Sequence, residues 1–343
     1  MRISLDAFGG DLGPEVNIRG AQEFLKESSQ AEVVLTGPEE KLKKLVGAGS
    51  PRLHIIDAPE LIPMAEKASA NLRHKKDSSL YKCIDLAVQN KTDACVSAGS
   101  SAAMMALSLL LMKRIKYVER PALVTPVPTL KEPTYCLDMG ANVDCKPIHL
   151  LHFALMGHAY AQVIKSIDRP RIGLISNGEE DTKGNELTRE THQLLKSIPE
   201  INYSGYCEGR DIFTGEFDVI VCDGFVGNVI LKTAEGLGET LMGLLKESFS
   251  SSLAGKLGYL LARNSLRPLK KKLDYAEYGG APLLGIGGIS IICHGRSTAT
   301  AIKNALHAAE KNYKEGLVEK LECAMNFKSL EGTHIKASGD INS

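Results

Sequence analysis

The sequence lacks the features that mark several large classes of protein. Lysine plus arginine and aspartate plus glutamate both total 41, so the formal net charge is 41 − 41 = 0, and nothing indicates a general nucleic-acid binder. No uninterrupted apolar run reaches the ~18 residues that a membrane-spanning helix needs. No long apolar segment follows the first residues, as it would in a signal peptide. We therefore expect a cytoplasmic protein whose contact with a membrane, if any, is peripheral.

Several catalytic signatures are also missing. There is neither a Gly-x-Gly-x-x-Gly motif after a strand nor a Gly-x-x-x-x-Gly-Lys-Ser/Thr motif, which argues against an ordinary dinucleotide or P-loop enzyme. The absence of Gly-x-Ser-x-Gly argues against a serine hydrolase. The eight cysteines form no Cys-x-x-Cys pair and several lie in apolar runs, which predicts reduced, buried thiols.

One group of residues has a spacing similar to that of metal ligands. Cys145, His149 and His152 are followed by His158, but all four lie in or next to an apolar helical run. Tetrahedral zinc sites usually contain more closely spaced pairs. We therefore predict no metal site.

The sequence does contain short β-rich runs that alternate with helical patterns. The runs are continuously apolar, which is typical of strands buried on both faces of a parallel sheet. We predict a three-layer α/β/α fold with a mostly parallel sheet, as one unit over residues 1–330, with a flexible tail at 331–343. The predicted strands are Arg2–Asp6, Glu32–Thr36, Leu53–Asp57, Ala94–Ser97, Ala122–Thr125, Tyr135–Asp138, Arg171–Ser176, Asp218–Cys222 and Ile289–Cys293.

Many of these runs end in turns of glycine and small residues. In a parallel sheet such turns share one edge, where they line a crevice, and the helices that follow direct backbone N–H groups toward an anion. We expect a phosphate-binding crevice there. The turns are Asp6–Asp11, Ser97–Ser101, Asp138–Asn142, Asn177–Gly184 and Asp223–Asn228.

The turn after the 171–176 run contains a lysine, Lys183, which suits an anionic substrate. The alternative is an ordinary solvated lysine. Three acids precede it, Glu179, Glu180 and Asp181. These acids either face solvent and helix amides or orient the lysine by charge pairing.

Two other candidates have equally simple structural alternatives. Ser100 and Ser101 begin a predicted helix, Ser101–Arg114, and could bind an anion or cap that helix. His294 follows the last predicted strand and could act in the site or cap the strand end.

Residues 248–273 form a basic amphipathic segment with six lysines and arginines and no acid. Four leucines, Leu253, Leu257, Leu260 and Leu261, fall at i, i+4, i+7 and i+8, which makes one apolar helical stripe. Such a helix can lie in the interface of an anionic membrane. The alternative is that the stripe packs on the core or on a second subunit.

Between residue 2 and about residue 316 the chain resembles the phosphate acyltransferases of the PlsX family. The matching segments, in order, are Leu5–Asp11, Lys75–Ser79, Ser97–Gly99, Arg120–Ala122, Leu137–Asp144, Asn177–Gly184, Glu208–Asp211, Cys222–Asn228 and His294–Gly295. The chain departs from the family pattern at Ser100–Ala102, where the family has Asn-Thr-Gly, and at Arg296–Thr298, where it has Ser-Ser-Asp.

The resemblance implies a fold similar to those of isocitrate and isopropylmalate dehydrogenases and of phosphotransacetylases. It implies conversion of acyl-(acyl carrier protein) and inorganic phosphate to acyl phosphate and free acyl carrier protein for phospholipid synthesis, with no cofactor. It also implies a homodimer at the inner face of the cell membrane, where a membrane acyl-phosphate:glycerol-3-phosphate acyltransferase is a possible partner. The protruding tip that touches the anionic membrane would be the 248–273 segment.

On this basis we predict three catalytic residues, Lys183, Asn228 and His294, and no metal. The acids Asp6, Asp138 and Asp223 are expected to shape loops and orient donors. The residues predicted to bind substrate or phosphate are Asp6, Gly9, Gly10, Ser97, Gly99, Ser100, Ser101, Asn142, Asn177, Gly178, Asp223 and Gly227; those predicted to touch the membrane are Leu253, Leu257, Leu260 and Leu261.

Two other functions remain open on the sequence. One is a metal-dependent hydroxy-acid dehydrogenase of the same fold class, in which a cluster of acids holds a divalent cation. The other is a non-catalytic protein that binds the acyl carrier and the membrane.

Overall fold

The computed structural model describes residues 1–343 except 48–49, 67–69, 274–278 and 331–343. Within the described residues the strands form a seven-stranded and a five-stranded sheet. In spatial order, the first contains β3 (Leu53–Asp57), β2 (Glu32–Gly37), β1 (Arg2–Asp6), β4 (Ala94–Ser97), β12 (Ser290–Ile292), β11 (Ala281–Leu284) and β5 (Ala122–Leu123). The second contains β6 (Thr125–Val127), β7 (Thr134–Leu137), β10 (Val219–Val221), β8 (Arg171–Ile175) and β9 (Asn202–Cys207).

One extended segment, residues 122–127, belongs to both sheets. Its first part pairs antiparallel with β11, and its second part pairs antiparallel with β7. The remaining pairs are parallel apart from β11 with β12. The prediction of a mostly parallel α/β fold is therefore confirmed, and the predicted strand 122–125 is the link between two sheets.

Two strands were not predicted, and each has a local reason. The β9 sequence is polar, and Gly205 has φ +99°, next to an irregularity in its pairing with β8. The β11 sequence contains Pro282, which is unfavourable in a central strand. By contrast β1, β3 and β4 have the predicted bounds. β1 and β4 are buried on both faces, as inner strands of a parallel sheet are, whereas β3 is an edge strand whose end is exposed.

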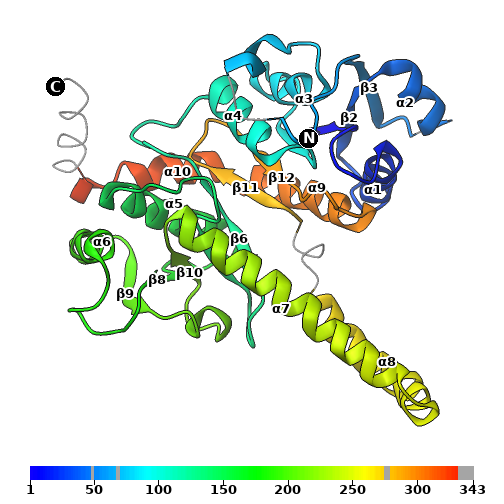
Figure 1. The fold of residues 1–343 in the computed structure, drawn as a ribbon. Coiled ribbons are helices and arrows are strands. Elements are labelled where there is room, and N and C mark those ends of the chain that lie inside the picture. The colour runs from blue at the N-terminus through cyan, green and yellow to red at the C-terminus, as the bar shows by residue number, and fades with distance from the viewer. Residues whose placement is uncertain (48–49, 67–69, 274–278, 331–343) are drawn as a thin grey trace.

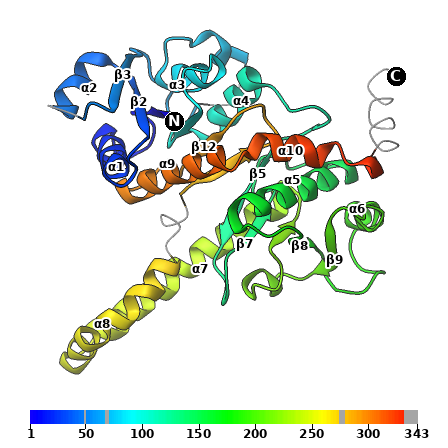
Figure 2. The ribbon, with the colours of Figure 1, turned by 180° about the vertical axis from the view of Figure 1, so that it is seen from behind.

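Helices cover both faces of each sheet and so make three layers (Figures 1 and 2). α1 and α9 cover one face of the first sheet, and α3 and α4 cover the other. α5 and α6 cover one face of the second sheet, with α10 packed on α5, and the start of α7 covers the other face. The helices are α1 (Pro14–Glu27), α2 (Glu39–Val46), α3 (Ser79–Val88), α4 (Ser101–Met112), α5 (Pro147–Lys165), α6 (Glu186–Lys196), α7 (Gly224–Ser250), α8 (Leu253–Leu273), α9 (Ala299–Lys314) and α10 (Leu317–Met325).

A shared hydrophobic core holds the two sheets together. Met104 and Leu107 of α4 lie in one buried cluster with Leu283 of the first sheet and with Cys136 and Ile220 of the second. This cluster joins α4 to residues of both sheets. The cysteines are free, and six of the eight are buried, as the sequence predicts. Burial raises the pKa of Cys136 to about 12, so it stays a thiol at neutral pH.

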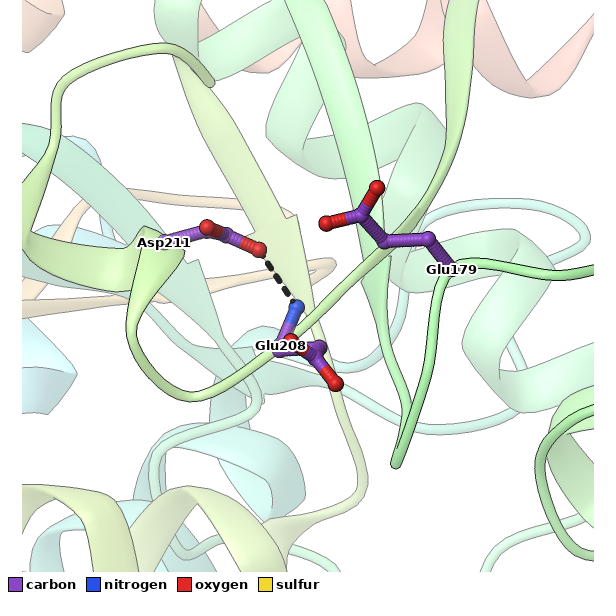
Figure 3. Close-up of side chains that lie close together, drawn as sticks. All are labelled: Glu179, Glu208 and Asp211. Atoms are coloured by element: carbon purple, nitrogen blue, oxygen red, sulfur yellow. Dashed lines mark hydrogen bonds between the residues drawn. The ribbon is translucent and has the colours of Figure 1, made fainter.

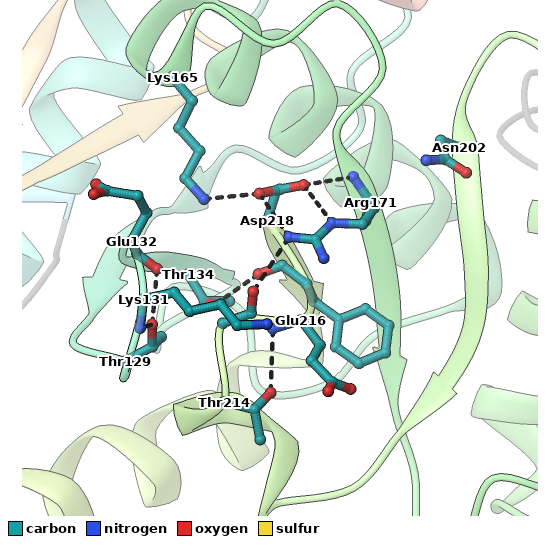
Figure 4. Close-up of polar contacts among 12 residues, drawn as sticks. Thr129, Lys131, Glu132, Thr134, Lys165, Arg171, Asn202, Thr214, Glu216 and Asp218 are labelled. Atoms are coloured by element: carbon teal, nitrogen blue, oxygen red, sulfur yellow. Dashed lines mark hydrogen bonds and ion pairs between the residues drawn. The ribbon is translucent and has the colours of Figure 1, made fainter.

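The edge of the second sheet at which β8 and β10 begin is held by ion pairs around the buried Asp218 (Figure 4). Asp218 accepts hydrogen bonds from Lys165 Nζ at 2.8 Å and from the Arg171 backbone and side chain at 2.9 and 3.0 Å. Burial acts to raise the pKa of Asp218, but the bonds from Arg171 and Lys165 outweigh it and hold that pKa at about 2.

α7 and α8 form a helical hairpin that projects from the body of the protein (Figures 1 and 2). The predicted 248–273 segment is thus the end of α7, a turn at 251–252, and α8. The four predicted membrane leucines are exposed: Leu253 by 86%, Leu257 by 60%, Leu260 by 63% and Leu261 by 78%. No helix in the described part of the chain is long and apolar enough to span a bilayer. The tail predicted at 331–343 lies outside the described residues.

Candidate active site

The first half of the candidate site lies where β1 and β4 end. The Asp6 carboxylate accepts a hydrogen bond from Ser97 Oγ at 2.8 Å, and Ser97 Oγ in turn accepts the Gly99 N–H at 2.9 Å. A Cβ on Gly9 would lie 2.6 Å from the Gly99 nitrogen, so only glycine permits this approach of the two turns. Burial raises the pKa of Asp6, although bonds from Ser79 and Ser97 act against it. Asp6 therefore organises the turn from a buried position.

The turn after β12 joins the same cluster. The Asp11 N–H donates to the Gly295 carbonyl at 2.7 Å. Gly10 is packed between this turn, at Gly295, and the turn after β4, at Ala98. The adjacent His294 is exposed, and its Nδ1 accepts the Arg296 N–H at 3.1 Å. In the neutral ring Nε2 then carries the proton.

The two serines at the start of α4 differ in role. Ser100 is the N-cap: its Oγ accepts the Ala103 N–H at 3.4 Å and lies 3.3 Å from the Glu66 carbonyl. The side chain of Ser100 therefore caps the helix, which is the structural alternative to binding an anion. Ser101 is exposed in the first turn of the helix, where N–H groups lack partners within the helix.

The second half of the site is built around Asp138, at the end of β7. Its Oδ1 accepts the N–H groups of Leu123 at 2.9 Å and Ala141 at 3.1 Å, and its Oδ2 accepts those of Asn142 at 2.6 Å and 2.9 Å. The Asn142 amide also donates to the Pro121 carbonyl at 2.7 Å. Burial raises the pKa of Asp138 against these bonds. Asn142 is thus held by the segment that links the two sheets.

The start of α7 lies against this turn. Asp223 caps the helix, with Oδ1 accepting the Val226 N–H at 2.9 Å. A Cβ on Gly227 would overlap the Asp138 carbonyl oxygen, so glycine is required for the helix to approach. Asn228, one residue further, is exposed and lies beside Gly140. Asp223 therefore positions the start of α7, and Asn228, in the first turns of the same helix, has the side chain that is exposed beside Gly140.

The turn that carries Lys183 is closed by Asn177, whose Oδ1 accepts the Gly184 N–H at 2.8 Å. The stem of Lys183 lies against the buried Gly178, where a Cβ would be 2.7 Å from Lys183 Cγ. The Lys183 side chain is exposed, and it makes no hydrogen bond or ion pair within the described residues. Its ammonium group is therefore available to an anion.

The three acids beside Lys183 do not form ion pairs with it. Glu179 pairs with Arg210 at 3.1 Å, and Asp181 pairs with His192 at 3.1 Å and with Lys196 at 2.8 Å. Charge pairing does occur in this turn, but its cations are Arg210, which follows β9, and Lys196 of α6, and not Lys183.

Glu179, Glu208 and Asp211 bring three carboxylates within 4.8 Å of one another (Figure 3). Arg210 lies 3.1, 2.9 and 3.7 Å from them and supplies the opposite charge. The Cys145 to His152 run forms no such group within the described residues. There His149 bonds Glu119 at 3.0 Å and the Lys146 N–H at 3.1 Å, a local capping arrangement.

A cavity of about 890 Å³ next to Asn142 was not predicted. Ala102 and Ala141 line it, so it adjoins both halves of the site, and Arg120 and Lys146 are among its cations. Arg120 was visible in the sequence as part of the Arg120–Ala122 segment, but its place beside Asn142 depends on the link between the sheets.

The predicted residues thus gather in three groups, around Asp6, around Asp138 and around Lys183. Leu123 and Pro121 connect the Asp138 group to the first sheet. Within the described residues no hydrogen bond or ion pair joins Lys183 to the Gly99–Ser101 turn. A ligand that met all three groups would have to bridge them.

Solved structures define the class of fold. A phosphotransacetylase from Streptococcus pyogenes aligns with a TM-score of 0.60 and 18% identity, covering 95% of this chain and 94% of that one. The EutD phosphotransacetylase from Staphylococcus aureus aligns with a TM-score of 0.59 and 14% identity, covering 91% and 94%. The protein has the phosphotransacetylase-like α/β/α fold.

The sequence comparisons identify the family. The sequence model described as fatty acid synthesis protein matches residues 1–320. The phosphate acyltransferase of Geobacter sulfurreducens is 49% identical over 324 residues, covering 94% of this chain and 93% of its own. That of Thermodesulfovibrio yellowstonii is 47% identical over 329 residues, covering 95% and 94%. The chain belongs to the phosphate acyltransferase family and is an acyltransferase.

Proposed function

We propose that the protein transfers an acyl group from acyl-(acyl carrier protein) to inorganic phosphate, giving acyl phosphate and free acyl carrier protein for phospholipid synthesis. The observation that carries this proposal is the unpaired ammonium of Lys183 on a glycine turn, in a member of the phosphate acyltransferase family. The helix start at Ser101 adds backbone N–H groups suited to an anion.

The chemistry needs positioning more than activation. Phosphate is partly a dianion near pH 7, with a second pKa near ~6 as in phosphate esters. We assign Lys183, Asn228 and the N–H groups near Ser101 to phosphate and to the oxyanion that forms on the thioester carbonyl. Asp6, Asp138 and Asp223, which accept hydrogen bonds from the loops, keep these donors in place.

A phosphate oxygen attacks the thioester carbonyl, the carbon–sulfur bond breaks, and the proton of hydrogen phosphate ends on the released thiol. A thiol with a pKa near ~8.5 is a good leaving group. His294, with its proton on Nε2, is our candidate for passing that proton. The scheme uses no cofactor.

The test is to incubate purified protein with an acyl-(acyl carrier protein) and phosphate and to trap acyl phosphate with hydroxylamine. We expect hydroxamate to form only when all three components are present, and its absence with every donor would contradict the proposal. Addition of a chelator should leave the rate unchanged. Loss of activity with a chelator would instead favour a metal-dependent enzyme of this fold.

The hairpin supports two further parts of the proposal. On α7, Leu237, Leu241 and Leu244 are exposed by 56%, 48% and 55% at i, i+4 and i+7, a stripe that suits a second copy of the chain. The exposed leucines at the start of α8 are flanked by Lys256, Arg263 and Arg267, which suits an anionic membrane surface. We propose that the protein forms a homodimer through the α7 stripe, which we call the shaft of the hairpin. We also propose that the start of α8, which we call the tip, makes peripheral contact with the membrane, where acyl phosphate could pass to a membrane acyltransferase.

A further inference from the structure

The outer face of α4 is an apolar stripe that the protein leaves partly uncovered. α4 contains no charged residue, and Ala103, Met104, Leu107 and Ser108 are buried on its inner face. A soluble surface helix normally has polar residues on the opposite face. Here that face is apolar too, at i, i+3, i+4, i+7 and i+8. The stripe consists of Ala102, Met105, Ala106, Leu109 and Leu110.

This stripe is the floor of the 890 Å³ cavity beside Asn142. Pro121, Ala141 and Leu283 supply further apolar surface. The volume lies within the range of about 300–1,000 Å³ that is usual for small-molecule sites. Leu110 is 50% exposed and Leu109 is 37% exposed, so the side chains of both leucines are accessible to a ligand in the cavity.

The cavity starts at the candidate active site and runs away from it. Ala102 follows Ser101 at the N-terminus of α4, and Lys113 is the residue after the last turn of that helix. The two are eleven positions apart, which corresponds to about 16 Å along the helix. The cavity is therefore a groove with one end at the reacting groups.

Cations line the groove at both ends. Arg120 and Lys146 lie near Asn142, Lys113 and Arg114 lie at the C-terminal end of α4, and the one acidic lining residue, Glu119, is hydrogen-bonded to His149 at 3.0 Å. The Asn142 end adjoins the candidate active site, so an apolar floor with cations at that end fits an amphiphile whose anionic head lies there and whose apolar tail lies along α4. An acyl phosphate is such a molecule.

We propose that this groove along α4 binds the acyl chain of the donor and of the acyl phosphate product, with the carbonyl carbon at the Asn142 end. The inference rests on the proposed acyl transfer and specifies where the chain lies. Each methylene group moved from water to the groove strengthens binding by about fourfold. Long acyl chains should therefore depend on the far half of the stripe, and short chains should not.

The test compares palmitoyl, octanoyl and butyryl donors with two variants, Ala106→Trp, which fills the groove midway, and Leu110→Asp, which places a charge at its far half. We expect kcat/KM for the palmitoyl donor to fall at least tenfold in both, and kcat/KM for the butyryl donor to change by less than twofold. Leu130→Asp is the matched control, because Leu130 is 88% exposed outside the groove; it should leave all three donors unchanged. Unfolding midpoints equal to that of the wild type would show that the variants fold.

Three outcomes are distinguishable. If wild type forms no acyl phosphate from any donor, the proposed function fails. If wild type is active and both groove variants keep the wild-type chain-length profile, the groove proposal alone is overturned. If Leu110→Asp changes the oligomeric state in sedimentation but not that profile, the groove is a contact between copies of the chain, and the proposal is again overturned.

A photoreactive group at the end of a palmitoyl chain gives a second measurement, independent of turnover. We expect the crosslink to map to residues 105–113. Labelling elsewhere, such as on the hairpin, would contradict an acyl chain in this groove.

Discussion

Asp181 and His192 are joined by a hydrogen bond of 3.1 Å between Oδ1 and Nε2, and Lys196 bonds the other oxygen, so within the described residues Asp181 pairs with these two groups and not with Lys183. Burial lowers the pKa of His192, so the ring is neutral at pH 7. Its Nδ1 is paired with the hydroxyl of Tyr203, and its ring stacks on Tyr206 at a centroid distance of 4.2 Å. Nε2 therefore donates to Asp181. A rigid, buried histidine thus anchors the turn that carries the lysine.

Replacing Asp181 with asparagine should weaken that anchor. Lys196, which bonds Asp181 Oδ2 at 2.8 Å, loses its anionic partner, and the turn gains freedom. Because misplacement of a positioning group by about 1 Å can cost up to ~10²-fold, we expect kcat/KM for phosphate to fall by roughly tenfold. Steady-state kinetics at varied phosphate concentration measure this effect.

Glu180→Gln is the matched control, since it removes the same charge from the same turn and Glu180 makes no ion pair within the described residues. It should have almost no effect. Equal losses in the two variants would mean that total charge, and not the anchor, determines activity.

Lys183→Ala tests the lysine itself. If its ammonium contacts phosphate or the oxyanion, turnover should fall by roughly 10²-fold, the scale of one lost oxyanion donor. The comparison is Lys44→Ala, which removes an exposed lysine on α2, away from the candidate site, and should leave turnover unchanged. Normal turnover in Lys183→Ala would remove this residue from the proposed mechanism.

Asp218→Asn should destabilise the fold without touching the candidate site. Lys165 and Arg171 would lose their shared carboxylate at a position where the Asp218 side chain is only 6% exposed. Removing one partner of a buried ion pair lowers the free energy of unfolding by about 3 kcal/mol or more, because the other charge stays buried without a partner. Denaturant unfolding measures the loss, and Asp168→Asn, at an exposed position, is expected to cost little.

The same ion pair predicts a pH dependence of stability. The pKa of Asp218 is about 2 in the folded protein, below the ordinary value near ~3.9 in an unfolded chain. The lowered pKa means that this stabilisation is complete above about pH 4 and is lost as the pH falls toward 2. Unfolding curves of wild type and Asp218→Asn should therefore converge at low pH. A constant difference between pH 7 and pH 2 would contradict this assignment.

The sequence predicted the fold where local pattern and burial agree. Strands such as β1 and β4 are buried on both faces, and the glycine turns after them mark the edge where the candidate site lies. It could not predict the partners of Asp181, because the sequence does not show on which side of a turn a carboxylate falls. The groove was missed for a similar reason. Its apolar stripe on α4 is indistinguishable in sequence from the core-facing residues of the same helix, and only the packing separates them.

The hairpin allows its two exposed apolar surfaces to be tested separately. Leu257→Glu with Leu261→Glu places two charges at the tip, where both leucines are more than half exposed, and Leu237→Glu with Leu244→Glu places two on the shaft. The tip variant should lose sedimentation with anionic vesicles, because charged residues cannot enter the acyl boundary, and should remain dimeric.

The shaft variant should become monomeric in analytical ultracentrifugation, because the buried face of a dimer does not tolerate unpaired charge. Either loss alone could be caused by misfolding, since each pair of substitutions adds two charges to one helix. If the tip variant loses only vesicle binding and the shaft variant loses only dimerisation, misfolding does not explain the results, because each variant serves as the folding control of the other. If the tip variant still sediments with vesicles, or the shaft variant stays dimeric, the corresponding surface does not have the role we assign to it.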